Sequence, residues 1–215
     1  MRWKRLHRYD PASWLGTYEP LIQHFLQRTI RHGDVFYDVG ANAGFFTVLA
    51  ARLVGQDGKV VAFEPHPINA QSVADQVKVN GFNNVVLINK AVSSERGIVT
   101  FCAGKDLSMG YVGAPVPGEE VIEVEAITLD DVLEDHLPPT IVKVDIEGGG
   151  VELVRGARTV AEKHRPIWIL EVHNHEEETA FKNLLVPLGY RFESLNSESI
   201  ATDQGLPNHV IALCD

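Results

Sequence analysis

The chain has 215 residues, 45% of them hydrophobic, which is enough to form one core of ordinary size. A formal net charge of −10 argues against nucleic acid as a partner. The first eight residues are rich in basic side chains, but no apolar run long enough to cross a bilayer follows them, so we expect no membrane contact. Cys102 and Cys214 lie far apart without metal-ligand spacing, as is usual for reduced thiols in a cytoplasmic protein.

The first predicted element is a helix within residues 18–30, where apolar side chains recur at helical spacing before Gly33. We interpret residues 1–33 as an N-terminal arm with a packing helix, and residues 34–215 as a single domain. Glu19 lies at the start of this helix, directly before a proline that suits the first helical turn. Its carboxylate either faces a ligand or only complements the helix dipole.

A buried strand is predicted at Val35–Val39, followed by a turn with two glycines and an apolar helix that ends near Gly55. The two glycines are Gly40 and Gly44. Glycine lets the backbone approach a ligand closely, and the free N–H groups of a helix N-terminus favour an anionic group. The turn is therefore a candidate ligand site, although two glycines four residues apart also serve plain packing of a helix on a strand.

The second predicted strand, residues 59–63, ends in Glu64 and Pro65. In doubly wound sheets an acid at this point binds ribose hydroxyls. The dinucleotide-binding pattern GxGxxG is absent, because Asn42 stands where its second glycine would be. We therefore favour S-adenosylmethionine as the ligand, with its amino-acid end in the glycine turn and its ribose on Glu64.

The next two elements are a helix at residues 68–79 and a third strand at Val85–Ile88. Asn69 either supports the acidic loop before this helix or only caps the helix. Ala91 follows the third strand, at a position where the base of the ligand could stack.

Two segments with alternating apolar residues, 98–102 and 121–126, are predicted strands. The stretch between them, 103–120, is rich in glycine and proline and has no strong period. Long loops of this kind in compact domains are usually functional or disordered. We interpret it as a flap on the substrate side, with a plain surface excursion as the alternative.

Charged side chains alternate through the next buried strand, residues 140–148. Lys143, Asp145 and Glu147 fall on one side of this strand. Ionisable groups on a buried strand are costly unless they pair or act chemically. An ion pair between Lys143 and one of the acids is the structural explanation. We favour a catalytic role for Asp145, because the carboxyl ends of parallel strands form the ligand crevice.

The following predicted strand, residues 166–173, also ends in charged side chains. Glu171 and His173 should therefore lie beside Asp145. A histidine beside two carboxylates acts as a general base, belongs to a metal site or forms a structural cluster. We take His173 as the second catalytic candidate, and we predict no metal because the spacing of these residues matches no metal-ligand rule.

The remaining predicted elements are helices at 151–164 and 177–188 and strands at 190–195 and 209–213. Strands that alternate with helices predict an α/β fold with a doubly wound, mostly parallel sheet. The late pair of strands predicts an antiparallel edge strand on that sheet.

Five motifs resemble, in order, those of the FkbM-type S-adenosylmethionine-dependent methyltransferases, from about residue 18 to residue 190. They are DVGANAG at 38–44 with Thr47, FEPHPIN at 63–69, LD at 129–130, KVDIEG at 143–148 and GA at 156–157. The resemblance implies the class I methyltransferase fold, a Rossmann-like, mostly parallel sheet of seven strands. It also implies S-adenosylmethionine as cofactor and O-methylation of a hydroxyl on a sugar or secondary metabolite, so the expected partner is a small hydroxylated acceptor.

Site residues follow from the motifs and from the strand ends together. The cofactor contacts implied by the resemblance are Asp38, Gly40, Asn42, Gly44 and Glu64, with Glu19 and Asn69 as weaker candidates. Pro65 and Ala91 complete the predicted cofactor site, and Asp145 and His173 are the predicted catalytic residues.

One position departs from the family pattern. Family members usually carry a glutamate shortly after the KxDxEG motif, and this chain has Gly150 there. The departure leaves two alternatives to the favoured reaction: a cofactor-binding module with impaired catalysis, or a methyltransferase that acts on a different small-molecule acceptor. An enzyme that methylates amines or nucleic acid would normally show a Pro-Pro-aromatic loop at 145–148, which is absent.

Overall fold

A computed structural model describes residue 3 and residues 15–103, 110–115, 117–118 and 120–214. The expectations for the other N-terminal residues and for part of the predicted flap lie outside these ranges. Among the described helices, none is long and apolar enough to cross a membrane. Cys102 is buried and Cys214 is half-buried, and neither forms a disulfide.

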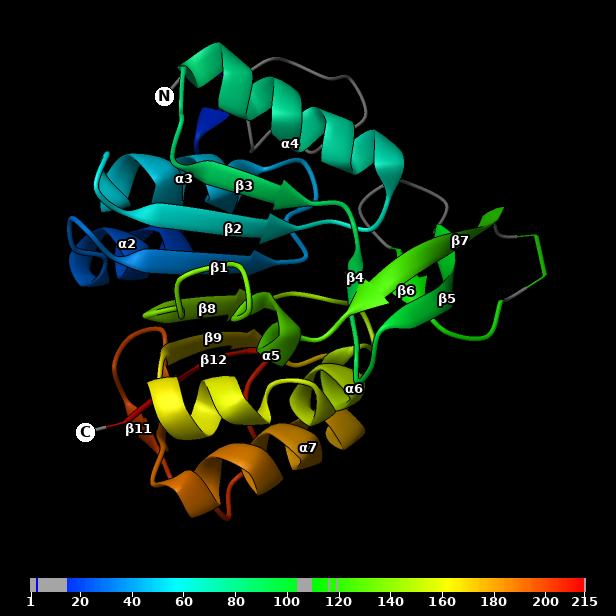
Figure 1. Cartoon of the computed structure of the whole chain (residues 1–215). Helices are drawn as coiled ribbons and strands as arrows, with labels where there is room; N and C mark the ends of the chain where they lie inside the picture. The colour runs from blue at the N-terminus through cyan, green and yellow to red at the C-terminus, as the bar shows by residue number, and fades with distance from the viewer. Residues whose placement is uncertain (1–2, 4–14, 104–109, 116, 119, 215) are drawn as a thin grey trace.

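An eight-stranded sheet forms the centre of this α/β fold, in the order β11, β10, β12, β9, β8, β1, β2 and β3 (Figure 1). The strands are β1 (Val35–Val39), β2 (Lys59–Phe63), β3 (Val85–Ile88), β8 (Ile141–Val144), β9 (Ile167–Glu171), β10 (Arg191–Ser194), β11 (Ser199–Ile200) and β12 (His209–Leu213). Strands β3, β2, β1, β8 and β9 pair in parallel, so their carboxyl ends meet at one edge.

The sheet differs from the predicted one in two respects. It has eight strands instead of seven, because the short β11 pairs with β10. It also has more than one antiparallel strand: β11 forms the edge and pairs antiparallel with β10, and β12 lies between β9 and β10 and pairs antiparallel with both. Residues 210–212 of β12 are fully buried, and a strand without exposed side chains is typical of the interior of a sheet.

Helices cover both faces of the sheet (Figure 1). They are α2 (Pro20–Thr29), α3 (Phe45–Val54), α4 (Pro67–Asn80), α5 (Leu129–Val132), α6 (Gly150–Arg155), α7 (His175–Leu185), a π-helical turn η1 (Val160–His164) and a 3₁₀ turn η2 (Val186–Leu188). The helices predicted at 151–164 and 177–188 are therefore each two pieces. The helix α6 ends at Arg155, with Gly156 as its C-cap, before η1 begins, and α7 is followed directly by η2.

The pleat of β1 divides the apolar core between the two faces. Phe36 packs with residues of α2 and α3, whereas its neighbour Tyr37 packs with residues of α5, α6 and α7. Both side chains are fully buried, and burial of a side chain of this size contributes about 2–3 kcal/mol. The alternation fixes the register of β1, and with it the position of the turn at its end.

A second sheet of four strands is inserted between β3 and β8. It consists of β4 (Ala91–Val92), β5 (Gly97–Ala103), β6 (Tyr111–Val112) and β7 (Glu120–Ile127), in the order β4, β7, β5, β6. The strands predicted at 98–102 and 121–126 are confirmed, and they pair antiparallel with each other. This sheet lies beyond the carboxyl ends of β2 and β3 (Figure 1).

Candidate active site

The order in which strands are added to the main sheet reverses at β1. From β1 it proceeds to β2 and β3 on one side, and later to β8 and β9 on the other. In doubly wound sheets, ligands bind at this switch point, outside the carboxyl ends of the strands. A cavity of about 600 Å³ lies there, within the usual range for small-ligand sites.

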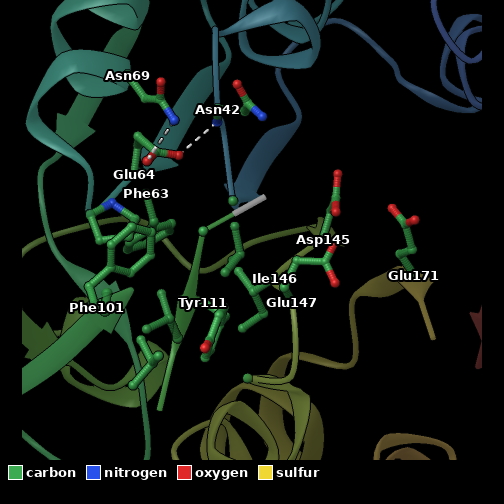
Figure 2. A pocket seen from close by; sticks show the side chains of 18 of the residues that line it. Asn42, Phe63, Glu64, Asn69, Phe101, Tyr111, Asp145, Ile146, Glu147 and Glu171 are labelled. Atoms are coloured by element: carbon green, nitrogen blue, oxygen red, sulfur yellow. Dashed lines mark hydrogen bonds between the residues drawn. The ribbon is translucent and has the colours of Figure 1, made fainter. Parts of the chain in front are cut away.

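Most of the predicted site residues line this cavity. They are Glu19, Gly40, Asn42, Glu64, Pro65, Asn69, Ala91 and Asp145. Figure 2 shows Glu64, Asn42 and Asn69 on one side of the cavity and Asp145 with Glu171 on the other. Asp38, Gly44 and His173 do not line it.

Glu64 is buried at the end of β2 and is held by the turn that follows β1. Its Oε2 accepts the backbone N–H of Asn42 at 2.8 Å, and its Oε1 accepts the backbone N–H of His66 at 2.9 Å. Asn69 Nδ2 lies 3.4 Å from Oε1 (Figure 2). Burial raises the pKa of Glu64 to about 7, although these donors favour the ionised form.

The two glycines of the turn serve different purposes. A Cβ on Gly40 would lie 1.8 Å from the carbonyl oxygen of Asp145, so only glycine allows the tips of β1 and β8 to approach this closely. Gly44 has φ +89, and a Cβ there would lie 3.1 Å from Cα of Val73 in α4. Gly44 therefore permits α3 to pack closely on α4, a contact between two helices and not the packing of a helix on a strand that the sequence suggested.

Three side-chain oxygens near this turn are buried and have no hydrogen-bond partner among the described residues. They are Oδ1 of Asp38, Oδ1 of Asn42 and Oε2 of Glu19. The other oxygen of Asp38 accepts the hydroxyl of Thr47 at 2.5 Å, beneath the cavity. Buried oxygens are normally paired, and Asn42 and Glu19 also have left-handed φ angles of 49° and 42°. Unpaired acceptors on a strained backbone beside a cavity indicate a ligand that donates hydrogen bonds.

Asp145 forms the ion pair that the sequence suggested. Lys143 Nζ lies 2.9 Å from Asp145 Oδ2, and the lysine side chain is only 3% exposed. Its ammonium also lies 5.0 Å from the ring centroid of Phe46. Burial and the nearby Glu171 carboxylate raise the pKa of Asp145, while Lys143 opposes the shift. Asp145 therefore combines a structural ion pair with a place on the cavity wall.

His173 lies behind the cavity among three carboxylates. Its Nε2 is 3.6 Å from both Glu147 Oε2 and Glu171 Oε1, and its Nδ1 is 3.3 Å from Glu177 Oε2. These carboxylates, Glu177 foremost, raise the pKa of His173 to about 9. The imidazole is accordingly protonated at neutral pH, and this form cannot accept a proton.

A family model described as Methyltransferase FkbM domain matches residues 38–194. The chain belongs to the FkbM methyltransferase family. The methyl donor of class I methyltransferases is S-adenosylmethionine, so the cofactor predicted from the sequence is confirmed at the level of the family.

Individual relatives of this FkbM methyltransferase are more distant. The hexuronic acid methyltransferase AglP of Haloferax volcanii is 25% identical over 142 residues, covering 65% of this chain and 56% of AglP. The chain thus spans less than two thirds of the length of the curated relatives it matches.

Solved structures show the same fold. The structure of methyltransferase FkbM from Methylobacillus flagellatus matches with a TM-score of 0.60 and 16% identity, over 96% of this chain and 56% of that chain. A Streptococcus mutans protein in complex with SAH matches with a TM-score of 0.51 and 13% identity, over 90% of this chain and 95% of that chain.

Two groups of side chains in this FkbM methyltransferase have the spacing of metal ligands. One is Asp145, Glu171 and His173, and the other is Glu19, Glu171 and His209; in each, the ligand atoms lie within 4.8 Å of one another. The structure therefore gathers the three residues that the sequence raised as a metal alternative. The absence of a metal stays a prediction.

Several residues that line the cavity were not predicted from the sequence. Phe101 of β5 and Tyr111 of β6 reach the cavity from the second sheet (Figure 2). Tyr111 also forms a β-bridge with Glu147, which joins the described end of the predicted flap to the turn after β8. The only signal was an aromatic residue in a predicted strand and another in the flap, and such residues are more often core residues than ligand contacts.

Proposed function

We propose that the protein transfers the methyl group of S-adenosylmethionine to a hydroxyl group of a sugar or a related small molecule. The observation that carries this proposal is the shared cavity. Glu64 at the tip of β2 and Asp145 at the tip of β8 line the same space, on opposite sides. The similarity to AglP, a hexuronic acid methyltransferase, supports a sugar as acceptor.

The residues on the Glu64 side of the cavity fit the cofactor. The Glu64 carboxylate is placed to accept the ribose hydroxyls, and the apolar side chains of Pro65, Ala91 and Phe101 would surround the adenine. The unpaired oxygens of Asn42 and Glu19 are suited to the ammonium group of the methionine moiety. When bound, S-adenosylmethionine supplies an electrophilic methyl group on a positively charged sulfur.

The chain's own contribution is to orient the acceptor and to receive a proton. Asp145 is the proposed proton acceptor, because it lines the cavity and because its pKa is raised toward neutral pH. A general base is most effective when its pKa lies near the pH of the reaction. Glu147 and Glu171 line the same end, and carboxylates there accept hydrogen bonds from the other hydroxyls of a sugar. His173 keeps its proton and balances the charge of these two acids.

A cofactor-binding module without catalysis is the alternative raised by Gly150. A carboxylate of another residue, Glu177, lies beside this position, but it does not line the cavity. The backbone N–H of Gly150 donates to Glu177 Oε1 at 3.0 Å.

The proposal is tested with methyl-labelled S-adenosylmethionine and a panel of neutral hexoses, hexuronic acids and amines. We expect label transfer to hydroxylated acceptors and none to the same acceptors with their hydroxyls already methylated. Transfer to amines alone would contradict O-methylation. Cofactor binding without transfer to any member of the panel would favour the non-catalytic module.

A further inference from the structure

Glu177 is a buried carboxylate that links two segments of the active-site wall. Its side chain is 1% exposed, although it lies in the first turn of a helix. Oε1 accepts the backbone N–H of Gly150 at 3.0 Å, and Oε2 accepts the backbone N–H of His173 at 2.9 Å. Oε2 also lies 3.3 Å from Nδ1 of the His173 ring. A buried carboxylate that accepts two backbone N–H groups is strongly fixed in place.

The Glu177 side chain occupies space that a side chain at position 150 would need. A Cβ on Gly150 would lie 3.0 Å from Cγ and 3.1 Å from Cδ of Glu177, and 2.8 Å from Cζ of Phe181. The contact with Phe181 is shorter than real Cβ atoms show, and the contacts with Glu177 are tighter than nine in ten real ones. A side chain at position 150 would therefore require Phe181 and Glu177 to shift, and glycine leaves Glu177 in its inward orientation.

The segments that Glu177 connects both carry cavity residues. Gly150 begins α6 directly after the turn with Asp145, Glu147 and Gly149, all of which line the cavity. His173 follows β9, whose last residue is Glu171. A displacement at either point would move the acids that face the acceptor.

We propose that Glu177 is a positioning residue for methyl transfer. It holds His173 and the start of α6 in place, and its side chain occupies space that is free because residue 150 is glycine. The inference rests on the proposed methyl transfer. Three acids face the His173 ring: Glu147 from the turn after β8, Glu171 from β9 and Glu177 from α7. Glu177 is the one that also holds the His173 backbone.

The test compares Glu177→Gln with Glu176→Gln, a matched change at an exposed residue one position earlier in the same helix. For Glu177→Gln we expect kcat to fall about 10- to 100-fold, with the Kd for S-adenosylmethionine within about twofold of wild type. NMR titration of His173 should show its pKa lowered in this variant and unchanged in Glu176→Gln. A role limited to stability would lower the unfolding midpoint but leave the kcat of the folded protein and the His173 titration unaltered.

The substitution Gly150→Ala tests the same contact between residues 150 and 177 from its other partner. Its added methyl group should press on Glu177 and Phe181 and lower kcat in the wild-type background. Its further effect should be smaller in the Glu177→Ala background, where the Cγ and Cδ atoms of residue 177 are absent. Additive losses in the double variant would overturn the proposal, as would a His173 pKa that Glu177→Gln leaves unchanged. If Glu177→Gln does not fold, hydrogen exchange of the backbone amides of Gly150 and His173 in the wild-type protein decides: strong protection of both amides supports the proposal, and exchange as fast as that of exposed amides overturns it. This measurement needs no turnover, so it separates failure of the positioning role from failure of the proposed methyl transfer.

Discussion

Asn42 donates its backbone N–H to Oε2 of Glu64 at 2.8 Å, and this bond ties the turn after β1 to the tip of β2. The bond forms where Asn42 adopts a left-handed conformation, with φ 49°. The backbone N–H of His66 donates to Oε1, the other oxygen of the same carboxylate. The Glu64 end of the cavity, where we propose that the cofactor binds, is thus held in place by the chain itself, so binding should require little rearrangement of Glu64.

Replacing Glu64 with glutamine should weaken cofactor binding. The substitution keeps the size of the side chain but removes the charge that strengthens hydrogen bonds from ribose hydroxyls. Loss of a charge-assisted pair costs roughly 1.5–3 kcal/mol, so we expect Kd to rise about 10- to 100-fold. Isothermal titration calorimetry measures the change, with the exposed Glu95→Gln as control. Equal affinities for Glu64→Gln and wild type would remove Glu64 from the cofactor site.

Cofactor affinity should also depend on pH through Glu64. The pKa of Glu64 is about 7, so its carboxylate is ionised above this pH and protonated below it. The protonated form accepts the ribose hydroxyls less well, and Kd should therefore rise as pH falls from about 8 to about 6. The dependence should be absent in Glu64→Gln. An affinity that is constant over this range in the wild-type protein would contradict the assignment.

Asp145→Asn should abolish turnover while the cofactor still binds. Asparagine cannot accept the proton of the acceptor hydroxyl, and loss of a general base costs about 100- to 10,000-fold in kcat. Single-turnover measurement of label transfer reports the loss, and calorimetry reports the retained affinity for S-adenosylmethionine. The exposed Asp135→Asn is the control. An unchanged rate in Asp145→Asn would exclude Asp145 from the reaction.

Gly40→Ala should be among the most destabilising single changes in the chain. Its methyl group would meet the carbonyl of Asp145 at 1.8 Å, and the residue has a φ of +82° that alanine tolerates poorly. We expect a loss of at least about 3 kcal/mol in the free energy of unfolding, measured by urea denaturation. Gly97→Ala is the control, because a Cβ there meets nothing within 4 Å. A similar midpoint for both variants would show that the tips of β1 and β8 can separate freely.

The sequence was sufficient to predict the strand tips and what they carry. Glu64 and Asp145 follow apolar runs that predict buried strands, and parallel strands bring such ends to one edge. Both residues line the cavity as a result. Local pattern and fold topology agree at these positions, which is why prediction succeeded there.

Contacts between distant segments could not be predicted in the same way. The inward position of Glu177 depends on the missing side chain of Gly150, 27 residues away in the chain. Phe101 and Tyr111 reach the cavity because the second sheet folds over the ends of β2 and β3, and no period in the sequence indicates that placement. Tertiary packing decided these positions, and a pattern read along the chain contains no information about it.

Calorimetric titration of the wild-type protein with S-adenosylmethionine tests the central claim most directly. The account predicts a single site with a Kd in the micromolar range, equivalent to roughly −8 kcal/mol of binding free energy. Absence of heat up to millimolar cofactor would contradict it.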